Sequence, residues 1–377
     1  MNTASTTYPS LAMLHYVCMH QNIPFVSFRL PQHQAITTLV QHTKFPEQIT
    51  DLSTLNALEG FIIAPFSEAE GYKSFLLQPD LQFKDDNVSD ELLSELSRCT
   101  LFASTVNAKT NLATTSKKEF EDNVRKAILA MEKDEFRKVV LSKTQVNEVP
   151  EGFSAAHFYQ KLCEKYPHAF VYFLQLPQVG CWIGATPEPL LTSDEAVLRT
   201  VSLAGTQAFT NLPLGDYKWS EKELEEQSIV TGFIEQTLQN AGINQYIKHP
   251  VENYRAANLI HLKSGFEFNQ SELANGISTL IQALHPTPSV GGLPKQEAYN
   301  FIRSTESHNR SYYTGFLGML QPQGETSLFV NLRCMQLINN QIILYSGAGI
   351  TTSSVPENEW TETENKLMTL KQVIFSL

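Results

Sequence analysis

The chain is short of positive charge, of paired cysteines and of long apolar runs. Its 377 residues include 28 lysines and arginines against 39 aspartates and glutamates, which gives a formal net charge of −11. An acidic surface repels phosphate backbones, so we expect no nucleic-acid partner. The five cysteines are odd in number and form no C-x-x-C pair, which predicts free thiols rather than a disulfide framework.

No apolar run approaches the roughly 20 residues that a membrane helix needs. The first basic residue is Arg29, so the start of the chain lacks the positive segment and apolar run of a secretory signal. We therefore expect no membrane partner and a cytoplasmic location. With 42% hydrophobic and 18% charged residues, the composition is that of a folded globular protein.

The chain contains many strand and helix patterns. Helical spacing of apolar residues predicts helices over 117–136, 219–240, 271–283 and 356–374, with another after Pro294. Apolar runs predict strands that include 138–142, 170–174, 180–184, 312–320, 326–337 and 341–347. Because strands often follow strands directly, we expect an α+β fold, with large antiparallel sheets packed together and helices around the outside.

A change in composition at 104–116 suggests a soft boundary ahead of the first of these helices. Threonine, asparagine, alanine and serine crowd together there, and a capping box begins at Ser116. We therefore separate residues 1–116 from residues 117–377, and expect them to form one continuous structural domain.

Two of the predicted helices carry glutamates three residues apart. Glu223 and Glu226 share one helix face, and so do Glu359 and Glu362. Mg²⁺ prefers carboxylate and water oxygens, and commonly bridges an anionic substrate to a protein. From spacing alone, two solvated acidic faces remain the alternative.

Two segments rich in glycine or proline are candidates for a pocket wall. Residues 346–352 are typical of a glycine-rich turn whose backbone amides could approach an anion, with an ordinary tight turn as the alternative. Residues 285–295 contain three prolines and two glycines, which constrain the backbone without building a strand or a helix.

Three single residues are ambiguous by themselves. Lys138 at a strand start is typical of a solvated lysine, and Glu188 of a turn carboxylate. His261 alternates with apolar neighbours, as a satisfied core histidine would.

Taken in order, these segments resemble the chorismate-utilising enzymes, which include isochorismate, anthranilate, aminodeoxychorismate and salicylate synthases. The resemblance covers roughly residues 117–377, which correspond to the chorismate-binding core. In this family the part that matches residues 1–116 is variable and completes the sheets. The motifs are Lys138–Ser142, Gly184–Glu188, Leu203–Thr206, Glu223–Glu226, His261–Leu262, residues 285–295, Arg310–Gly315, Ser346–Ile350 and Glu359–Lys366.

Within the family, three features favour an isochorismate synthase. Lys138 stands where isochorismate-type enzymes use a lysine to activate water and where the ammonia-using anthranilate synthases have glutamine. Ala204 stands where aminodeoxychorismate synthases carry a lysine. The 285–295 loop is similar to the H-P-T-P-A-V-G-G form of isochorismate synthases. We therefore expect no glutamine amidotransferase subunit.

Two residues depart from the isochorismate synthase pattern. Ser289 stands where these enzymes usually have alanine, which leaves open the lyase activity of a salicylate synthase. Gln227 replaces the histidine that commonly follows the metal-binding glutamate, which alters the surroundings of a ligand without removing it.

The resemblance implies a Mg²⁺-dependent conversion of chorismate to isochorismate. Lys138 would activate the water that attacks C2, and Glu188 would protonate the departing C4 hydroxyl. A neutral lysine and a protonated glutamate coexist at neutral pH only if burial shifts both pKa values, so this mechanism requires a buried site. The metal ligands would be Glu226 and Glu362, with Glu223 and Glu359 beside them or acting through water.

The resemblance also implies a set of substrate-binding residues. Among them, Arg333 and Tyr313 would bind the enolpyruvyl carboxylate, and Lys366 would lie near the metal-bound carboxylate. The full set is Ala204, Gly205, Thr206, His261, Ser289, Tyr313, Arg333, Gly347, Gly349 and Lys366.

Two alternatives remain. One is a salicylate synthase, which adds pyruvate elimination, and the other is a non-catalytic metal-binding relative. The presence of both Lys138 and Glu188 argues against the second. The residues do not decide whether the product serves menaquinone or siderophore synthesis.

Overall fold

The structure, a computed structural model, describes residues 8–99, 113–194, 196–338 and 340–376. Residues 104–112 of the expected boundary lie outside this part. The described strands form two large antiparallel sheets. The first sheet has the order β15 (Gly292–Leu293), β7 (Lys138–Glu148), β19 (Gln341–Ile350), β18 (Cys334–Ile338), β9 (Gly180–Thr186), β8 (Phe170–Leu176), β1 (Phe25–Arg29), β2 (Thr37–Val40), β6 (Leu81–Lys84).

The second sheet is also antiparallel, and β13 (Glu252–Ala256) pairs with its strand β14. These two sheets confirm the expected α+β class. The order of the second sheet is β12 (Tyr246–Lys248), β14 (Leu259–Asn269), β11 (Val197–Ala208), β10 (Pro189–Asp194), β17 (Ser327–Val330), β16 (Phe316–Leu320), β4 (Gly60–Ala64), β5 (Ser74–Leu77), β3 (Glu47–Ile49).

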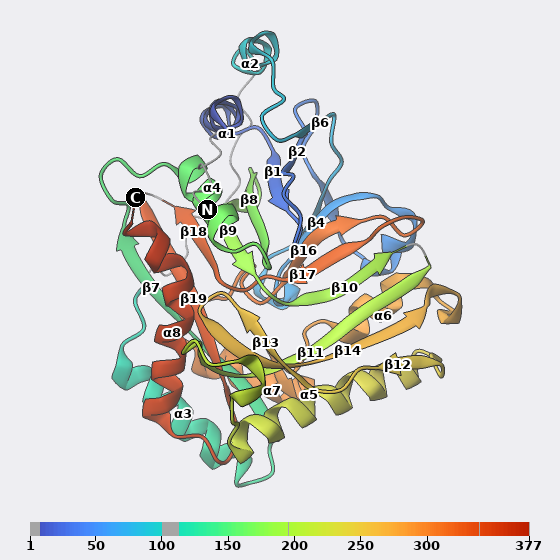
Figure 1. The fold of residues 1–377 in the computed structure, drawn as a ribbon, viewed down its shortest axis with the longest axis vertical. Helices are drawn as coiled ribbons and strands as arrows, with labels where there is room; N and C mark the ends of the chain where they lie inside the picture. Colours follow the sequence, from blue (N-terminus) through green and yellow to red (C-terminus); the bar gives the residue numbers. More distant parts are fainter. Residues whose placement is uncertain (1–7, 100–112, 195, 339, 377) are drawn as a thin grey trace.

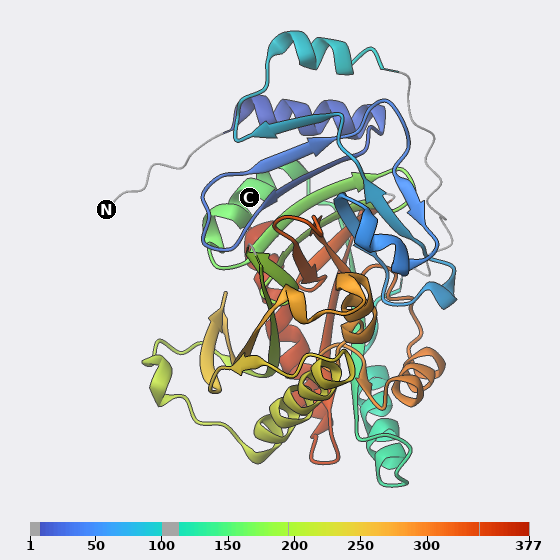
Figure 2. The same ribbon diagram turned by 90° about the vertical axis from the view of Figure 1, so that its right-hand side faces the viewer.

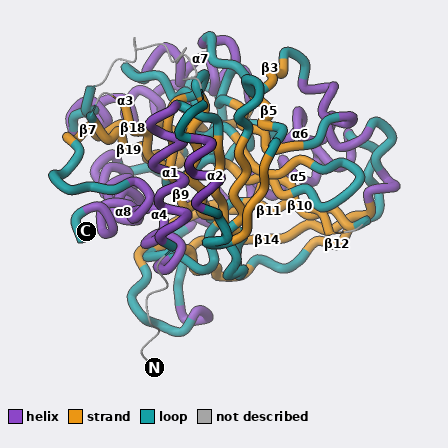
Figure 3. The backbone as a smooth tube through the Cα atoms, turned by 90° about the horizontal axis from the view of Figure 1, so that it is seen from above, coloured by secondary structure: helices purple, strands orange, loops and turns teal. Residues whose placement is uncertain are grey.

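Helices cover the outer faces of the sheets. Seen from above, α1, α2, α4 and α8 lie on one side of the strands, and α5 and α6 on the other (Figure 3). Figure 2 shows α1 and α2 at the top of the molecule, far from α3 and α5 at the bottom. The helices are α1 (Pro9–Gln21), α2 (Asp90–Leu96), α3 (Lys117–Met131), α4 (Ala155–Lys165), α5 (Glu221–Asn240), α6 (Gly276–Leu284), α7 (Lys295–Thr305) and α8 (Pro356–Ile374). None of the described helices is long and apolar enough to cross a membrane.

The continuous apolar run 170–174 of β8 is explained by burial on both faces. Phe170 and Tyr172 belong to an aromatic core that also contains residues of the second sheet, such as Phe329. Val171 and Phe173 point the other way, into a core shared with α1, α4 and α8. Since successive side chains of a strand alternate between faces, a strand covered on both sides must be apolar throughout.

Strands from the first hundred residues extend both sheets. In the first sheet β1 pairs with β8, and β2 and β6 follow it to the edge. In the second sheet β4 pairs with β16, and β5 and β3 complete that edge. The two sheets therefore draw strands from both ends of the chain (Figure 1).

Several predicted boundaries are wrong. The first helix ends at Met131 rather than near residue 136, because Asp134 adopts a left-handed conformation and its amide donates back to the Met131 carbonyl at 3.0 Å. The helix expected at 271–283 begins only at Gly276, where Asn56 from a distant segment accepts a hydrogen bond from the Ser278 amide at 2.9 Å. That contact is tertiary, so local spacing does not show it.

The segment predicted as one strand over 326–337 is two strands in different sheets. It leaves the second sheet after β17, crosses over, and joins the first sheet as β18. The strand predicted from 312 begins at Phe316, because Ser311 and Thr314 have positive φ angles of 53° and 62° and form a turn. The 285–295 loop contributes the two-residue strand β15, which pairs with the start of β7.

The glycine-rich segment 346–352 is not the turn that we predicted. Its residues as far as Ile350 belong to β19, and they pair in regular register with β7, with Gly349 opposite Val140. This strand is buried throughout most of its length. Its glycines therefore serve the packing of side chains across the strand rather than a reversal of the chain.

Candidate active site

A small cavity, which we call the inner cavity, lies between the two sheets and the helices α5 and α8. Its volume is about 50 Å³. All ten residues expected to bind the substrate line it, together with Glu188 and Glu226. Two further lining residues, Leu332 and Tyr345, lie outside every motif of the sequence analysis. The rest lie within those motifs without having been singled out, and they are Val140, Pro187, Leu203, Val290, Thr314 and Ser346.

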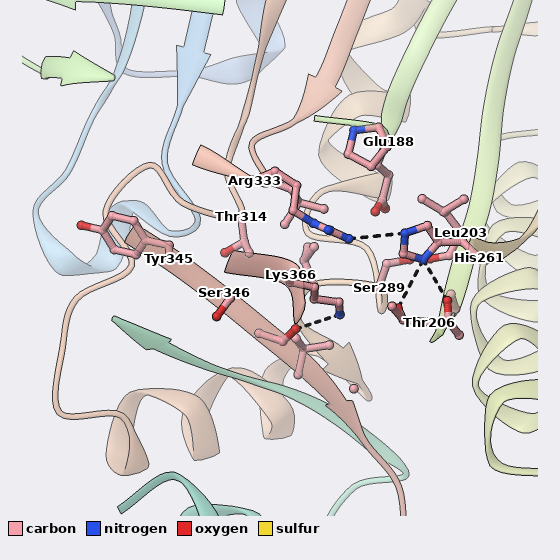
Figure 4. A pocket seen from close by; sticks show the side chains of 18 of the residues that line it. Glu188, Leu203, Thr206, His261, Ser289, Thr314, Arg333, Tyr345, Ser346 and Lys366 are labelled. Atoms are coloured by element: carbon pink, nitrogen blue, oxygen red, sulfur yellow. Dashed lines mark hydrogen bonds between the residues drawn. The ribbon is translucent and has the colours of Figure 1, made fainter. Parts of the chain in front are cut away.

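Two crossovers between the sheets position Glu188 and Arg333. The chain passes from β9 to β10 through Glu188, and it returns from β17 to β18 through Arg333. The Ala185 amide donates to the Arg333 carbonyl at 3.0 Å, and the Val330 amide donates to the Glu188 carbonyl at 2.9 Å. These bonds tie the crossovers together, so both side chains reach the same space from neighbouring segments (Figure 4).

Lys138 begins β7 and is fully buried. Its Nζ lies 3.0 Å from Oε1 of Glu226 on α5. Burial lowers the pKa of Lys138, although the negative charge of Glu226 opposes this shift. Burial would also raise the pKa of Glu226, but the charges of Lys138 and Lys222 outweigh it and lower that pKa to about 2.

Glu188 is the second buried titratable group of this region, with 3% of its surface exposed. Burial raises its pKa to about 7, although the positive charges of Lys138, Lys366 and Arg333 oppose the shift. Near neutral pH a large fraction of Glu188 therefore carries a proton. A buried lysine and a buried glutamate have pKa values displaced toward each other, as acid–base chemistry at neutral pH requires.

His261 and Arg333 form a hydrogen-bonded pair on one wall of the inner cavity. Nδ1 of His261 lies 2.9 Å from the Gly205 carbonyl oxygen, which can only accept, so Nδ1 carries the proton. Nε2 then accepts from Nη2 of Arg333 at 3.3 Å. Burial lowers the pKa of His261 to about 3, helped by the charge of Arg333, so the ring is neutral.

The opposite wall is formed by the glycines of β19. A Cβ on Gly349 would overlap a carboxylate oxygen of Glu226, and a Cβ on Gly347 would lie 3.1 Å from the Tyr313 hydroxyl oxygen. The Gly347 carbonyl accepts from Nζ of Lys366 at 2.8 Å. The absence of these side chains therefore leaves room for the Glu226 carboxylate and the Tyr313 hydroxyl.

Beyond Glu226, α5 and α8 face each other with further carboxylates. Nζ of Lys222 lies 2.8 Å from Oε1 of Glu359, and Nζ of Lys366 lies 2.6 Å from Oε1 of Glu362. Burial and the neighbouring charge of Glu362 raise the pKa of Glu359 to about 7. Burial would lower the pKa of Lys222, but Glu362, Glu226 and Glu359 together raise it above its usual range.

Glu223 lies at the edge of this group. Its carboxylate accepts from the Ser220 amide at 3.0 Å and completes the capping box at the start of α5. With Glu359 and Glu362 it lines a separate cavity of about 340 Å³, which we call the carboxylate cavity.

Comparison with known proteins identifies the family. Residues 79–375 match the family of chorismate binding enzymes, which is more than half of the chain. The chain belongs to this family. Its membership confirms the resemblance inferred from the motifs.

Curated chorismate-binding relatives include several activities. The isochorismate synthase EntC of Escherichia coli K12 is 29% identical over 260 residues, covering 67% of this chain and 66% of that protein. Anthranilate synthase component 1 of Aquifex aeolicus is 28% identical over 271 residues, covering 69% of this chain and 53% of that protein. The chain thus spans a little under two thirds of the length of the first relative, and about half of the second.

A solved structure shares the fold. The menaquinone-specific isochorismate synthase MenF of Escherichia coli aligns with a TM-score of 0.74 at 21% identity, covering 93% of this chain and 88% of that one. This likeness extends to nearly the whole chain, including strands contributed by the first hundred residues.

The carboxylates of this chorismate-binding enzyme are of the right donor type for Mg²⁺. Glu226, Glu359 and Glu362 present oxygens from two facing helices, and each now pairs with a lysine. Among the described residues, no three histidine, cysteine, aspartate or glutamate side chains are already arranged as a metal site. These carboxylate oxygens therefore suit a hard divalent cation that keeps several of its waters. Such a cation would take the place of the lysines as the partner of the glutamates.

Sequence reasoning missed Lys222, which lies among three carboxylates. The available signal was its spacing, because Lys222 and Glu226 are four residues apart and therefore share a helix face. Sequence reasoning also missed the buried ion pair of Arg310 and Glu306, whose closest atoms are 2.6 Å apart. Nη2 of Arg310 donates to the Val140 carbonyl at 2.6 Å and so fixes β7 near Lys138.

Proposed function

We propose that this chorismate-binding enzyme is an isochorismate synthase. The observation that carries the proposal is the buried pair Lys138 and Glu188, whose pKa values are displaced toward each other beside the inner cavity. Isochorismate formation needs one group that accepts a proton from water and another that donates a proton to a leaving hydroxyl. The curated isochorismate synthase relative supports the same assignment.

In the proposed reaction, Lys138 takes a proton from the water that attacks C2 of chorismate. The ring double bonds shift, the C4–oxygen bond breaks, and Glu188 gives its proton to the departing hydroxyl. One water is consumed and one released, so the reaction is an isomerisation. Because the bonds broken and formed are of the same type, we expect it to be freely reversible.

Substrate charge is met by residues of the inner cavity. Chorismate carries two carboxylates, and Arg333 with Tyr313 would bind the one on the enolpyruvyl group. The neutral His261 accepts from Arg333 without competing for an anion, which leaves the guanidinium charge to the substrate. Lys366, fixed by the Gly347 carbonyl, would lie near the ring carboxylate.

We propose that Glu226 and Glu362 hold Mg²⁺, with Glu223 and Glu359 beside them or acting through water. When bound, the ion would offset the charge of the ring carboxylate and fix its position.

A salicylate synthase is the second candidate, and Ser289 is the observation that favours it. Its hydroxyl lines the inner cavity and donates to the Leu203 carbonyl at 2.9 Å. Purified protein should be incubated with chorismate and Mg²⁺, and the products separated by chromatography with fluorescence detection. Isochorismate as the main product supports the first proposal, whereas fluorescent salicylate as the main product supports the second.

The same assay tests the choice of nucleophile. Lys138 and Ala204 both favour water over ammonia, so adding ammonium salts should give no anthranilate or aminodeoxychorismate. An amine as the main product would show that the enzyme uses ammonia rather than water. It would also contradict the expectation that no glutamine amidotransferase subunit is needed.

A further inference from the structure

A second cavity, which we call the outer cavity, adjoins the inner one. Its volume is about 570 Å³, against about 50 Å³ for the inner cavity. Arg333 and Pro187 line both, so the two spaces meet at these residues. Pockets for small molecules usually measure about 300–1,000 Å³. The outer cavity therefore already has room for a substrate-sized molecule, whereas the inner cavity must widen before the substrate binds among its residues.

The outer cavity carries positive charge in a protein that is negative overall. Lys165 at the end of α4, Arg255 on β13 and Arg333 line it. Glu252 is the acidic residue among its described lining, and Lys263 lies 3.4 Å from its carboxylate. Neither Lys165 nor Arg255 has a carboxylate within ion-pairing distance among the described residues, and both are exposed.

Aromatic rings accompany these two exposed cations. The guanidinium carbon of Arg255 lies 3.6 Å from the centre of the Phe209 ring, which fixes the direction of the side chain. Nζ of Lys165 lies 5.9 Å from the centre of the Tyr166 ring, and Tyr166 also lines the cavity. The result is a partly apolar space with cations at its rim, which suits a ring that carries carboxylates.

The carboxylate cavity on another side of the site has the opposite charge. It shares Thr206 with the inner cavity, and its charged lining residues are Lys222, Glu223, Glu359 and Glu362. Three carboxylates against one ammonium would repel an anion. This holds while no metal is bound there. Of these two larger cavities, the outer cavity is therefore the one whose own side chains favour an approaching dicarboxylate.

We propose that the outer cavity is a capture site for the dicarboxylate substrate, which then passes Arg333 into the inner cavity. This inference rests on the proposed function, since it takes chorismate as the ligand. Lys165 and Arg255 concentrate the dianion at the rim, and Arg333 receives a carboxylate where the two cavities meet. An enzyme with a net charge of −11 needs such a local positive region, because its overall field repels the substrate.

The test compares two double variants with equal changes of charge. Lys165→Glu with Arg255→Glu reverses the rim of the outer cavity. Lys44→Glu with Lys248→Glu makes the same change at two exposed lysines that line neither cavity. In a Glu188→Gln background, which holds turnover back, the association rate of chorismate is followed by stopped-flow tryptophan fluorescence at low and high salt.

We expect the rim variant to slow association by about tenfold or more at low ionic strength, since electrostatic steering contributes roughly 10–10³ to association rates. The difference from the control should shrink at high salt. In the active background, kcat should match that of the control variant, and so should Mg²⁺ affinity measured by calorimetry. Lys165→Gln and Arg255→Gln, each alone, should give smaller decreases in the association rate. These single variants keep the test valid if the double variant does not fold.

Equal association rates in the two double variants would overturn the capture site, and so would a lower kcat in the rim variant alone. Failure of the proposed function is distinguishable, because wild-type protein would then bind no chorismate or would not convert it to isochorismate.

Discussion

The two ends of the inner cavity carry charge in opposite ways. At one end, Arg333 is held by a neutral histidine, and none of the carboxylates in the part of the chain that the structure describes forms an ion pair with it. At the other end, Glu226 pairs with Lys138, and Glu362, which lies beyond it in the carboxylate cavity, pairs with Lys366. The comparison indicates that the positive charge of Arg333 is balanced only when an anion binds. At the carboxylate end, by contrast, a metal ion can take the place of the lysines that now pair with the glutamates.

Lys138 and Glu188 lie beside the inner cavity, and the loss of either side chain should have the largest effect on turnover. Lys138→Ala and Glu188→Gln should each lower kcat by roughly 10²–10⁴ with a modest change in KM, because both groups act mainly in the transition state. Steady-state kinetics with chorismate would measure this, and Lys44→Ala and Glu325→Gln serve as surface controls. Wild-type kcat in Lys138→Ala would require another base.

Removal of Mg²⁺ or of its proposed ligands at the carboxylate end should have the next largest effect on activity. Excess chelator should abolish turnover and added Mg²⁺ should restore it, while Glu226→Gln and Glu362→Gln should each lower activity on the order of a hundredfold, since several kcal/mol of charge stabilisation are lost. Calorimetric titration with Mg²⁺ provides an independent measurement. Full activity in chelator, or normal Mg²⁺ binding by both variants, would show that the ligands are wrongly assigned.

The dependence on pH sharpens the contrast between acid and base. Because burial raises the pKa of Glu188 to about 7, its protonated fraction should fall about tenfold per pH unit well above that value. The forward rate should fall with the same slope once the pH also exceeds the pKa of Lys138. At lower pH the rate should fall as Lys138 becomes protonated, which gives a bell-shaped profile whose apparent pKa values belong to the pair. In Glu188→Gln the residual rate should lose its alkaline limb, and persistence of that limb would exclude Glu188 as the acid.

The arginine end should give the smallest of these effects. Arg333→Lys keeps the charge but removes the planar fork, so we expect KM for chorismate to rise about tenfold with a smaller change in kcat, in line with the loss of one charge-assisted hydrogen bond. Arg137→Lys provides a matched control outside the cavity. An unchanged KM would mean that Arg333 does not hold the substrate carboxylate.

Local sequence patterns predicted the helices of the carboxylate end well. The helix over 356–374 matches α8, and the glutamate spacing placed Glu226 on the face of one helix and Glu362 on the face of another, because helical periodicity is a local property. That the two helices face each other is a tertiary feature that spacing did not show. The fold class also followed from the succession of strands. Family resemblance, rather than spacing, was needed to bring Arg333 and His261 into the same site.

Features that depend on distant contacts were missed. The glycines of β19 suggested a turn, yet they are small because Glu226 and the Tyr313 hydroxyl occupy the space beside them. The break between β17 and β18 depends on a crossover between sheets, and the apolar pattern continues across it. Neither cause is visible within a window of ten residues.

The central claim is that water, activated at the inner cavity, becomes the C2 hydroxyl while the C4 hydroxyl leaves. The most direct test is turnover of chorismate with Mg²⁺ in water enriched in ¹⁸O, stopped early so that the reverse reaction contributes little, and followed by mass spectrometry of the separated product. The account predicts isochorismate that carries one ¹⁸O atom at C2. Isochorismate without ¹⁸O, or no conversion of chorismate, would contradict it.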